Sequence, residues 1–328
     1  MRQLFALCGL VLALSGCASP SVSPTPLPTV TVIVTSAPTE TIAPPTATQL
    51  PVTSTPTLTA TPALGAMLCP TAESTCIVPG HFIFRRPFEP SVNNEIDQTY
   101  RYGTTQNDLR EPHYGVDFPN ARSTRVLAVG DGRVVVAGDD KFKKYGWFAN
   151  FYGNLVVIEH DVSGVNAPVY TLYGHLSKVL ATVGQQVHAG DLIGEVGSSG
   201  IAIGSHLHLE VRIGNNDYKS TRNPELWVQP RAGTGVLAGR VLDAQGNLVS
   251  SAINVQRLQG DRILPDHIYL AETYVRESLH GDDILNENFA VGELPAGDYR
   301  LTLIYNGRVY EQRVKIVDGM LTVVEFRE

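Results

Sequence analysis

Two histidines stand one residue apart in the stretch GSHLHLEVR, residues 204–212. Strand alternation places His206, His208 and Glu210 on one face and the intervening apolar residues on the other. The apolar face is typical of a buried strand, but packing does not explain two imidazoles side by side. For Glu210 we expect a surface position, with a hydrogen bond to a ligand imidazole as the alternative.

Further residues with metal-binding chemistry occur upstream of this pair. PHYGVDF contains His113 and Asp117, and its glycine and flanking prolines favour an extended segment or loop over a helix. A catalytic zinc site takes three protein ligands from imidazole and carboxylate groups and leaves a fourth position for water. His113, Asp117 and one histidine of the HLH pair would supply those three ligands to one zinc ion.

Hydrolysis at such a site also needs a general base and a donor to the developing oxyanion. The second histidine of the pair lies about 7 Å further along the strand and fits the base. The alternative for it is a residue that orients a ligand or the substrate. His175, in TLYGHLSKV after a predicted strand, fits the oxyanion donor.

The elements that must position these residues read as short strands. Segments such as RVLAVGDGRVVVAGDD and QQVHAGDLIGEVGSS are broken by glycine-rich turns, and helical periodicity is almost absent. Residues 67–230, with a core at 81–228, are therefore expected to form an all-β domain of antiparallel sheet. Within it, residues 139–154 interleave lysines with aromatic residues. This segment is either a long hairpin that packs its own rings or the rim of a substrate cleft.

Three motifs in order, HYGVD, YGHL and GSHLHLEVR, resemble the lysostaphin-type (LytM-like) zinc endopeptidases, which cut the peptide part of bacterial peptidoglycan. The resemblance covers roughly residues 81–228. It implies zinc ligation by three residues and catalysis by two histidines. The implied ligands are His113, Asp117 and His208, and the implied catalytic residues are His206 and His175.

The chain departs from this family pattern at two points. The family commonly has Thr-Gly or Pro before the HxH motif, where this chain reads GIAIGSHLH; the change affects the loop and not the ligands. Many members also use a tyrosine near the metal, and Tyr100 or Tyr102 are candidates here, although neither spacing matches well.

The function implied is a zinc-dependent endopeptidase of peptidoglycan stem peptides or crossbridges. The alternative is a non-catalytic activator or scaffold of other wall hydrolases, a role taken by relatives that have lost ligands. All five implied residues are present, which favours the enzyme. A sugar-binding protein with a structural metal is disfavoured because structural zinc sites usually have four protein ligands.

The first residues predict export. Residues 1–17 combine Arg2 with an apolar run at 4–14, too short to span a bilayer comfortably. Leu-Ser-Gly-Cys at 14–17 resembles a lipobox, which implies cleavage before Cys17, lipid on its sulfur and a lipoprotein held outside the membrane of a bacterial cell envelope. The alternative is an ordinary secretory signal cut near Ala18.

Residues 18–66 are dominated by proline and threonine, with one charged residue, and predict a disordered spacer. Beyond it, Cys69 and Cys76 are the cysteines left after loss of the signal and lipidation of Cys17. An even remainder in an oxidising compartment predicts a disulfide between them. The net charge of −7 argues against a nucleic-acid partner.

Residues 233–328 predict a second all-β domain. Turn signals at QGN, PAG and NG separate about seven strands, which is typical of a β-sandwich. GRVLDAQGNLV and LPAGDYRLTL resemble the carboxypeptidase regulatory-like, prealbumin/Ig-like sandwich. Without clustered histidines, cysteines or a serine triad, this part is expected to act as a spacer or a wall-binding module.

Overall fold

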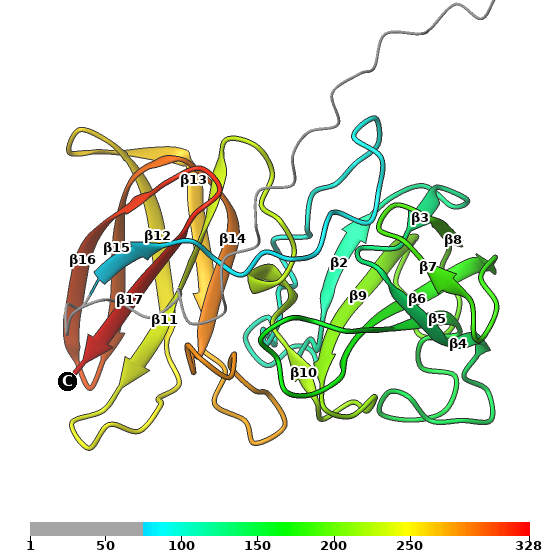
Figure 1. Ribbon diagram of the computed structural model, residues 1–328. Helices are drawn as coiled ribbons and strands as arrows, with labels where there is room; N and C mark the ends of the chain where they lie inside the picture. The colour runs from blue at the N-terminus through cyan, green and yellow to red at the C-terminus, as the bar shows by residue number, and fades with distance from the viewer. Residues whose placement is uncertain (1–74) are drawn as a thin grey trace, which may run out of the picture. The chain divides into compact units, whose positions relative to one another are not determined.

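The computed structural model describes residues 75–328, all within one compact unit, Leu58–Glu328 (Figure 1). This described chain is all-β, as predicted, and its single helical element is the short 3₁₀ helix η2 (Pro224–Leu226). No helix in residues 75–328 is long and apolar enough to cross a bilayer.

Predictions made for the first part of the chain lie outside the described residues. These are the signal peptide at 1–17 and the spacer at 18–66. Cys76 is disulfide-bonded. Its predicted partner, Cys69, is not among the described residues, so that pairing stays a prediction.

A nine-stranded sheet carries the histidine motifs. Its strands are β2 (Val116–Pro119), β3 (Arg125–Leu127), β4 (Gly132–Asp139), β5 (Asn154–His160), β6 (Val169–Val179), β7 (Gln186–Val187), β8 (Leu192–Val196), β9 (His206–Ile213) and β10 (Thr221–Arg222). The hydrogen-bonded order is β10-β9-β6-β5-β4-β7, with β2 on β9 and with β8 on β6 and β3. All these pairs are antiparallel.

Strand β9 shows the predicted alternation. Leu207, Leu209 and Val211 are fully buried in the main hydrophobic core. The opposite face carries the two histidines and Glu210. Because β9 lies between β2 and β6, this face meets side chains from both neighbours, which is how distant motifs come together.

The remaining strands form two four-stranded sheets. They are β1 (Thr75–Val78), β11 (Thr234–Leu242), β12 (Ala252–Gln259), β13 (Arg262–Glu272), β14 (Phe289–Pro295), β15 (Gly297–Tyr305), β16 (Arg308–Ile316) and β17 (Leu321–Arg327). One sheet has the order β1-β17-β11-β14 and the other β13-β12-β15-β16. Strand β1 thus pairs with the last strand of the chain. The resemblance to a prealbumin-type sandwich stays a prediction.

Local sequence explains the tight hairpin between β15 and β16. Asn306 and Gly307 connect Tyr305 to its partner Arg308, and both central residues have positive φ, 49° and 74°. This is the backbone of a type I′ turn, for which Asn-Gly is strongly preferred.

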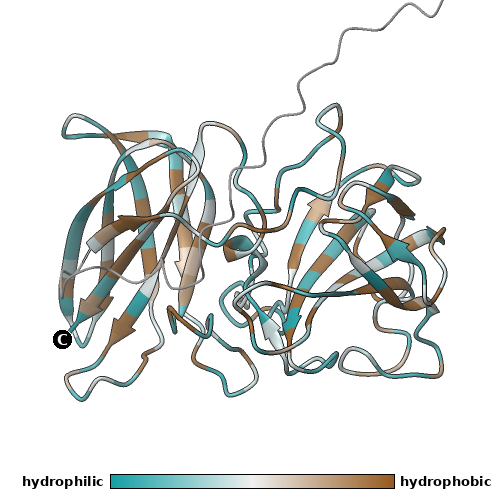
Figure 2. Cartoon of the chain, viewed as in Figure 1, coloured by the Kyte–Doolittle hydropathy of each residue, from teal (hydrophilic) through white to brown (hydrophobic). Residues whose placement is uncertain are grey.

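The cores follow from the strand patterns. Figure 2 shows hydrophobic and hydrophilic residues interleaved along many of the strands. Trp227, after η2, is fully buried and packs against Phe84 and His81. A second cluster fills the space between the two four-stranded sheets, with Tyr299 and Phe289 fully buried in it.

Candidate metal centre and catalytic cleft

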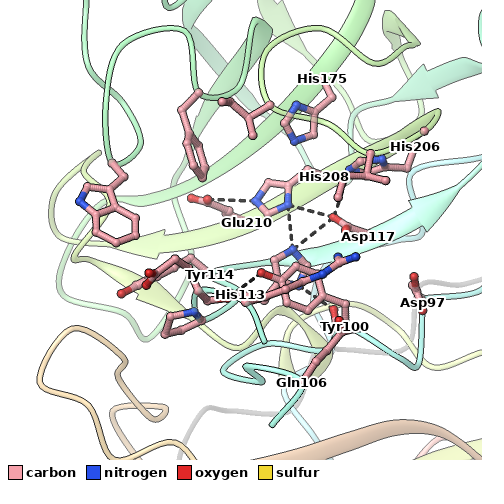
Figure 3. Close-up of a pocket in the computed structure, with 18 of the residues that line it drawn as sticks. Asp97, Tyr100, Gln106, His113, Tyr114, Asp117, His175, His206, His208 and Glu210 are labelled. Atoms are coloured by element: carbon pink, nitrogen blue, oxygen red, sulfur yellow. Dashed lines mark hydrogen bonds and ion pairs between the residues drawn. The ribbon is translucent and has the colours of Figure 1, made fainter. Parts of the chain in front are cut away.

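Three predicted ligands converge from two neighbouring strands and the segment that precedes them. Figure 3 shows His113, Asp117 and His208 pointing toward one another. The Nε2 atom of His113 lies 3.1 Å from Nδ1 of His208 and 3.3 Å from Oδ1 of Asp117, and the third separation is 3.0 Å. Ligands placed tetrahedrally about zinc at about 2.0–2.1 Å lie about 3.3 Å apart. The cluster therefore fits a single zinc ion.

Strand register explains this convergence. Asp117 of β2 is paired directly with His208 of β9, so their side chains occupy the same face at a cross-strand position. Gly115 gives the ligands room, because a Cβ there would lie 2.8 Å from the His208 ring and 2.5 Å from the Leu209 carbonyl oxygen. Any larger residue at position 115 would collide with a ligand.

The segment before β2 fixes the His113 ring. Nδ1 of His113 donates to the Tyr100 carbonyl oxygen at 2.6 Å, and the two rings stack with centroids 4.2 Å apart. This contact leaves the Nε2 lone pair free to face the cluster. Of the two candidate tyrosines, Tyr100 is therefore the one beside the ligands; Tyr102 is buried and its hydroxyl contacts the Thr221 and His280 carbonyl oxygens instead.

We expected Glu210 at the surface, but the structure shows it fully buried. Its Oε1 accepts from Nε2 of His208 at 3.0 Å and from the Tyr152 hydroxyl, and its Oε2 accepts from Nε of the equally buried Arg212 at 2.7 Å. Alternation assigned Glu210 to the correct face, but it does not reveal that Tyr145 and Tyr152 from the 139–154 segment cover that face. The alternative, a hydrogen bond to a ligand imidazole, is the observed one.

Charges around His208 shift its protonation and that of its partners. Burial disfavours the charged imidazole, but Asp117 and Glu210 outweigh it and raise the His208 pKa to about 9 in the metal-free protein. Burial opposes the charged form of Glu210 too, yet Arg212 and His208 lower the Glu210 pKa to about 2. For Asp117 burial is likewise outweighed, by His113 and His208, and its pKa lies well below the usual range.

The two predicted catalytic histidines flank the ligand cluster. The rings of His175 and His206 lie 4.9 Å apart, and Nε2 of His206 is 3.6 Å from Oδ1 of Asp117. His175 has a positive φ of 61° within β6, an uncommon conformation that the sequence does not reveal. The structure thus brings all five predicted residues to one place.

Hydrogen bonding limits what His175 can do. Its Nδ1 lies 2.8 Å from the Ser199 carbonyl oxygen, and because a carbonyl only accepts, Nδ1 carries a hydrogen. Burial, followed by the neighbouring His208 and His206, lowers the His175 pKa to about 3. The neutral ring therefore presents a lone pair at Nε2, and it becomes an oxyanion donor only after taking up a proton there.

These residues lie in a cleft of about 640 Å³. Aromatic and aliphatic side chains line it together with the histidines; among them are Trp147, Phe148, Phe151, Ile201 and Ile203. Trp147 and Ile203 are 48% and 80% exposed. The 139–154 segment packs its own rings, Phe148 edge-on to Phe151, and it also lines the cleft; that substrate binds along it stays a prediction.

The part of the chain that contains these residues is similar to known peptidases. Residues 111–220 match the model of Peptidase family M23. The M23 match contains every predicted site residue. Together with the relatives described next, it supports a peptidase.

Named relatives align with about a third or more of the chain. Peptidoglycan DD-endopeptidase ShyB of Vibrio cholerae is 36% identical over 104 residues, 32% of this chain and 21% of the relative. Lysostaphin of Staphylococcus simulans is 38% identical over 130 residues, 39% of this chain and 24% of the relative. The match thus spans about a quarter or less of these relatives. The crystallised catalytic domain of S. simulans lysostaphin is 30% identical, with 38% of this chain and 82% of that domain covered and a TM-score of 0.31.

Proposed function

We propose that this chain is a zinc-dependent endopeptidase that cleaves peptide bonds in peptidoglycan stem peptides or crossbridges. The observation that carries the proposal is the orientation of the two imidazole ligands. Each has one nitrogen committed to an acceptor, the Tyr100 carbonyl or Glu210, and the other directed at Asp117. Such outer partners are typical of metal-ligating histidines. The substrate class rests on the relatives, which are named as peptidoglycan endopeptidases.

The chain's own residues would divide the chemistry as follows. His113, Asp117 and His208 would hold zinc, which lowers the pKa of bound water to about 7 and polarises a carbonyl. His206, whose Nε2 lies 3.6 Å from Oδ1 of Asp117, would accept the proton of the attacking water. The proton taken from the water would be the one passed on: on Nε2 of His175, whose ring lies 4.9 Å from that of His206, it would be donated to the oxyanion and then transferred to the leaving amine.

The cleft supports a peptide substrate. Apolar walls with a few polar groups at the base are usual for ligand sites. An extended peptide bound in the cleft would contact apolar lining residues such as Trp147, Phe148 and Ile203. These side chains would bind the apolar parts of the peptide beside the histidines.

The test is digestion of purified sacculi by the full chain, with release of peptide fragments followed by mass spectrometry. We expect release that stops with a chelator, returns with zinc and falls to background for Asp117→Ala. No release by protein shown to hold one zinc per chain would contradict the enzyme. If such a protein instead stimulated a second wall hydrolase, the activator alternative would take its place.

A further inference from the structure

A short left-handed turn borders the cleft. Gln106, Asn107 and Asp108 have φ values of 51°, 58° and 61°, three consecutive non-glycine residues in the left-handed region. Each such residue is disfavoured by about 1–2 kcal/mol, less for Asn and Asp. The turn therefore needs partners that hold it, and Gln106 lines the cleft.

The partner of the turn is a carboxylate from the four-stranded sheet β13-β12-β15-β16. Glu272, the last residue of β13, accepts from the Thr105 backbone amide at 2.9 Å, from the Thr105 hydroxyl at 3.0 Å and from the Asn107 amide at 3.1 Å. Hydrogen bonds to an ionised carboxylate are stronger than neutral ones. Burial opposes ionisation of Glu272, but these donors outweigh it and lower its pKa.

The residues just before this turn hydrogen-bond to the backbone of His113. The amide of Gly103 donates to the His113 carbonyl oxygen at 2.7 Å, and the His113 amide donates to Thr104 at 3.2 Å. The Gln106 side-chain amide donates to the Thr99 carbonyl oxygen at 2.9 Å, next to the Tyr100 that orients the His113 ring. Thr105, which contacts Glu272, is thus adjacent in sequence to Thr104, which contacts the backbone of the ligand His113.

Further contacts join the chain after β13 to the segment that contains His113. The chain that follows β13 places Tyr274 edge-on against Tyr102, with ring centroids 5.2 Å apart. Further along, the Ser278 hydroxyl lies 2.6 Å from the hydroxyl of Tyr114, the residue after His113. The connection between β13 and β14 therefore contacts the His113 segment on both sides of the left-handed turn.

We propose that Glu272 is a positioning residue for the metal centre, and that the C-terminal sheets complete the active site instead of serving only as a spacer or wall-binding module. The inference rests on the proposed function in so far as His113 is a zinc ligand. Glu272 would hold the left-handed turn, the turn would hold residues 100–104, and these would hold the His113 imidazole in its ligating orientation.

The test compares three variants of the full chain: Glu272→Ala, Glu272→Gln and the control Glu277→Gln. Glu277 lies exposed five residues further along the same connection. Two readouts need no peptidase activity: hydrogen exchange of the amides at 99–113, and zinc affinity by competition with a chelating dye. For Glu272→Ala we expect exchange at Thr105 and Asn107 faster by about tenfold or more. We also expect Glu272→Ala to bind zinc about tenfold more weakly. In the metal-free form its melting temperature should equal that of the control Glu277→Gln.

Glu272→Gln should fall between the other two, because its amide oxygen still accepts but the charge is gone. Unchanged exchange or unchanged zinc affinity in Glu272→Ala would overturn the proposal. If Glu272→Ala fails to fold, Glu272→Gln decides: zinc affinity equal to that of Glu277→Gln would overturn it. Wild-type protein that binds zinc without digesting sacculi would contradict the proposed function and leave these readouts valid.

Discussion

At the scale of single residues, the metal centre depends on which nitrogen of each imidazole is free. His113 presents Nε2 because Tyr100 accepts from Nδ1, and His208 presents Nδ1 because Glu210 accepts from Nε2. Arg212 in turn balances the buried charge of Glu210. The two ligands are therefore oriented by different devices, a backbone carbonyl on a loop and a fully buried ion pair.

Zinc uptake is predicted to release a proton from His208. The raised pKa of about 9 means that this imidazole is charged in the metal-free protein near neutral pH, and it must lose its ligating proton to bind zinc. Calorimetry in buffers of different ionisation enthalpy at about pH 7.5 should show about one proton released per zinc. Zero release would mean that His208 is neutral beforehand or is not a ligand.

The same shifts set the pH dependence of stability without metal. The Glu210 pKa is depressed, so its contribution is present above the unfolded value near 4.5 and is lost as the pH falls toward 2. The His208 pKa is raised, so its contribution is present below about 6.5 and is lost as the pH rises through 9. Chemical denaturation of the metal-free protein should therefore show stability falling at both ends, and a flat profile from pH 6.5 to 9 would contradict the His208 assignment.

Gly115→Ala should weaken zinc binding by about tenfold or more, a loss comparable to that of an outer ligand partner. The added methyl would meet the His208 ring and the Leu209 carbonyl oxygen, so the ligand must move. A chelator competition titration measures the affinity, and the melting temperature of the metal-free variant reports any global damage. Affinity equal to wild type would show that the ring is not held where we describe it.

At the scale of elements, β9 and the 139–154 segment together determine the site. Alternation in HLHLEVR predicted the buried face of β9 correctly, because a period of two leaves no other arrangement once one face is apolar. It did not predict that the opposite face is also covered, since the cover comes from Tyr145 and Tyr152, far away in sequence. That is why Glu210 was expected at the surface.

Other features could not be predicted from the sequence either, because they also depend on contacts between residues far apart in the chain. The left-handed φ of His175 has no basis in local residue preference, and in the turn at 106–108 Asn and Asp tolerate this conformation without predicting three consecutive residues in it. The five site residues could be predicted because zinc chemistry restricts residue types strongly and because the resemblance to lysostaphin-type endopeptidases implied which histidine of the HLH pair is the ligand. Glu272 had no such signal: it is one acidic residue at the end of a strand.

For the cleft wall, Trp147→Ala should raise KM for a peptide substrate several-fold with kcat nearly unchanged. The half-exposed ring lines the cleft and is none of the five predicted metal and catalytic residues, so we expect it to contribute equally in the ground and transition states. Steady-state kinetics on a defined crossbridge peptide measure both constants. Phe142→Ala is the matched control, because Phe142 is on the same segment, 99% exposed, and outside the cleft lining. Equal effects of the two changes would argue against a peptide-binding rim.

At the scale of the whole molecule, the sequence predicts a lipid tether at Cys17. Lipidation at Cys17 rests on the sequence alone and lies outside the described residues. We predict that the chain expressed in a bacterium incorporates labelled fatty acid and sediments with membranes, and that Cys17→Ser abolishes both. Fractionation with a palmitate analogue checks this, and labelling that persists in Cys17→Ser would contradict the lipobox assignment.

The central claim is that one zinc ion is held by His113, Asp117 and His208. Anomalous diffraction at the zinc edge from crystals of the full chain tests it most directly. We predict a single peak at about 2.0–2.2 Å from Nε2 of His113, Oδ1 of Asp117 and Nδ1 of His208. A peak coordinated by His175 or His206 in place of one of these three, or no peak in protein supplied with zinc, would contradict the account.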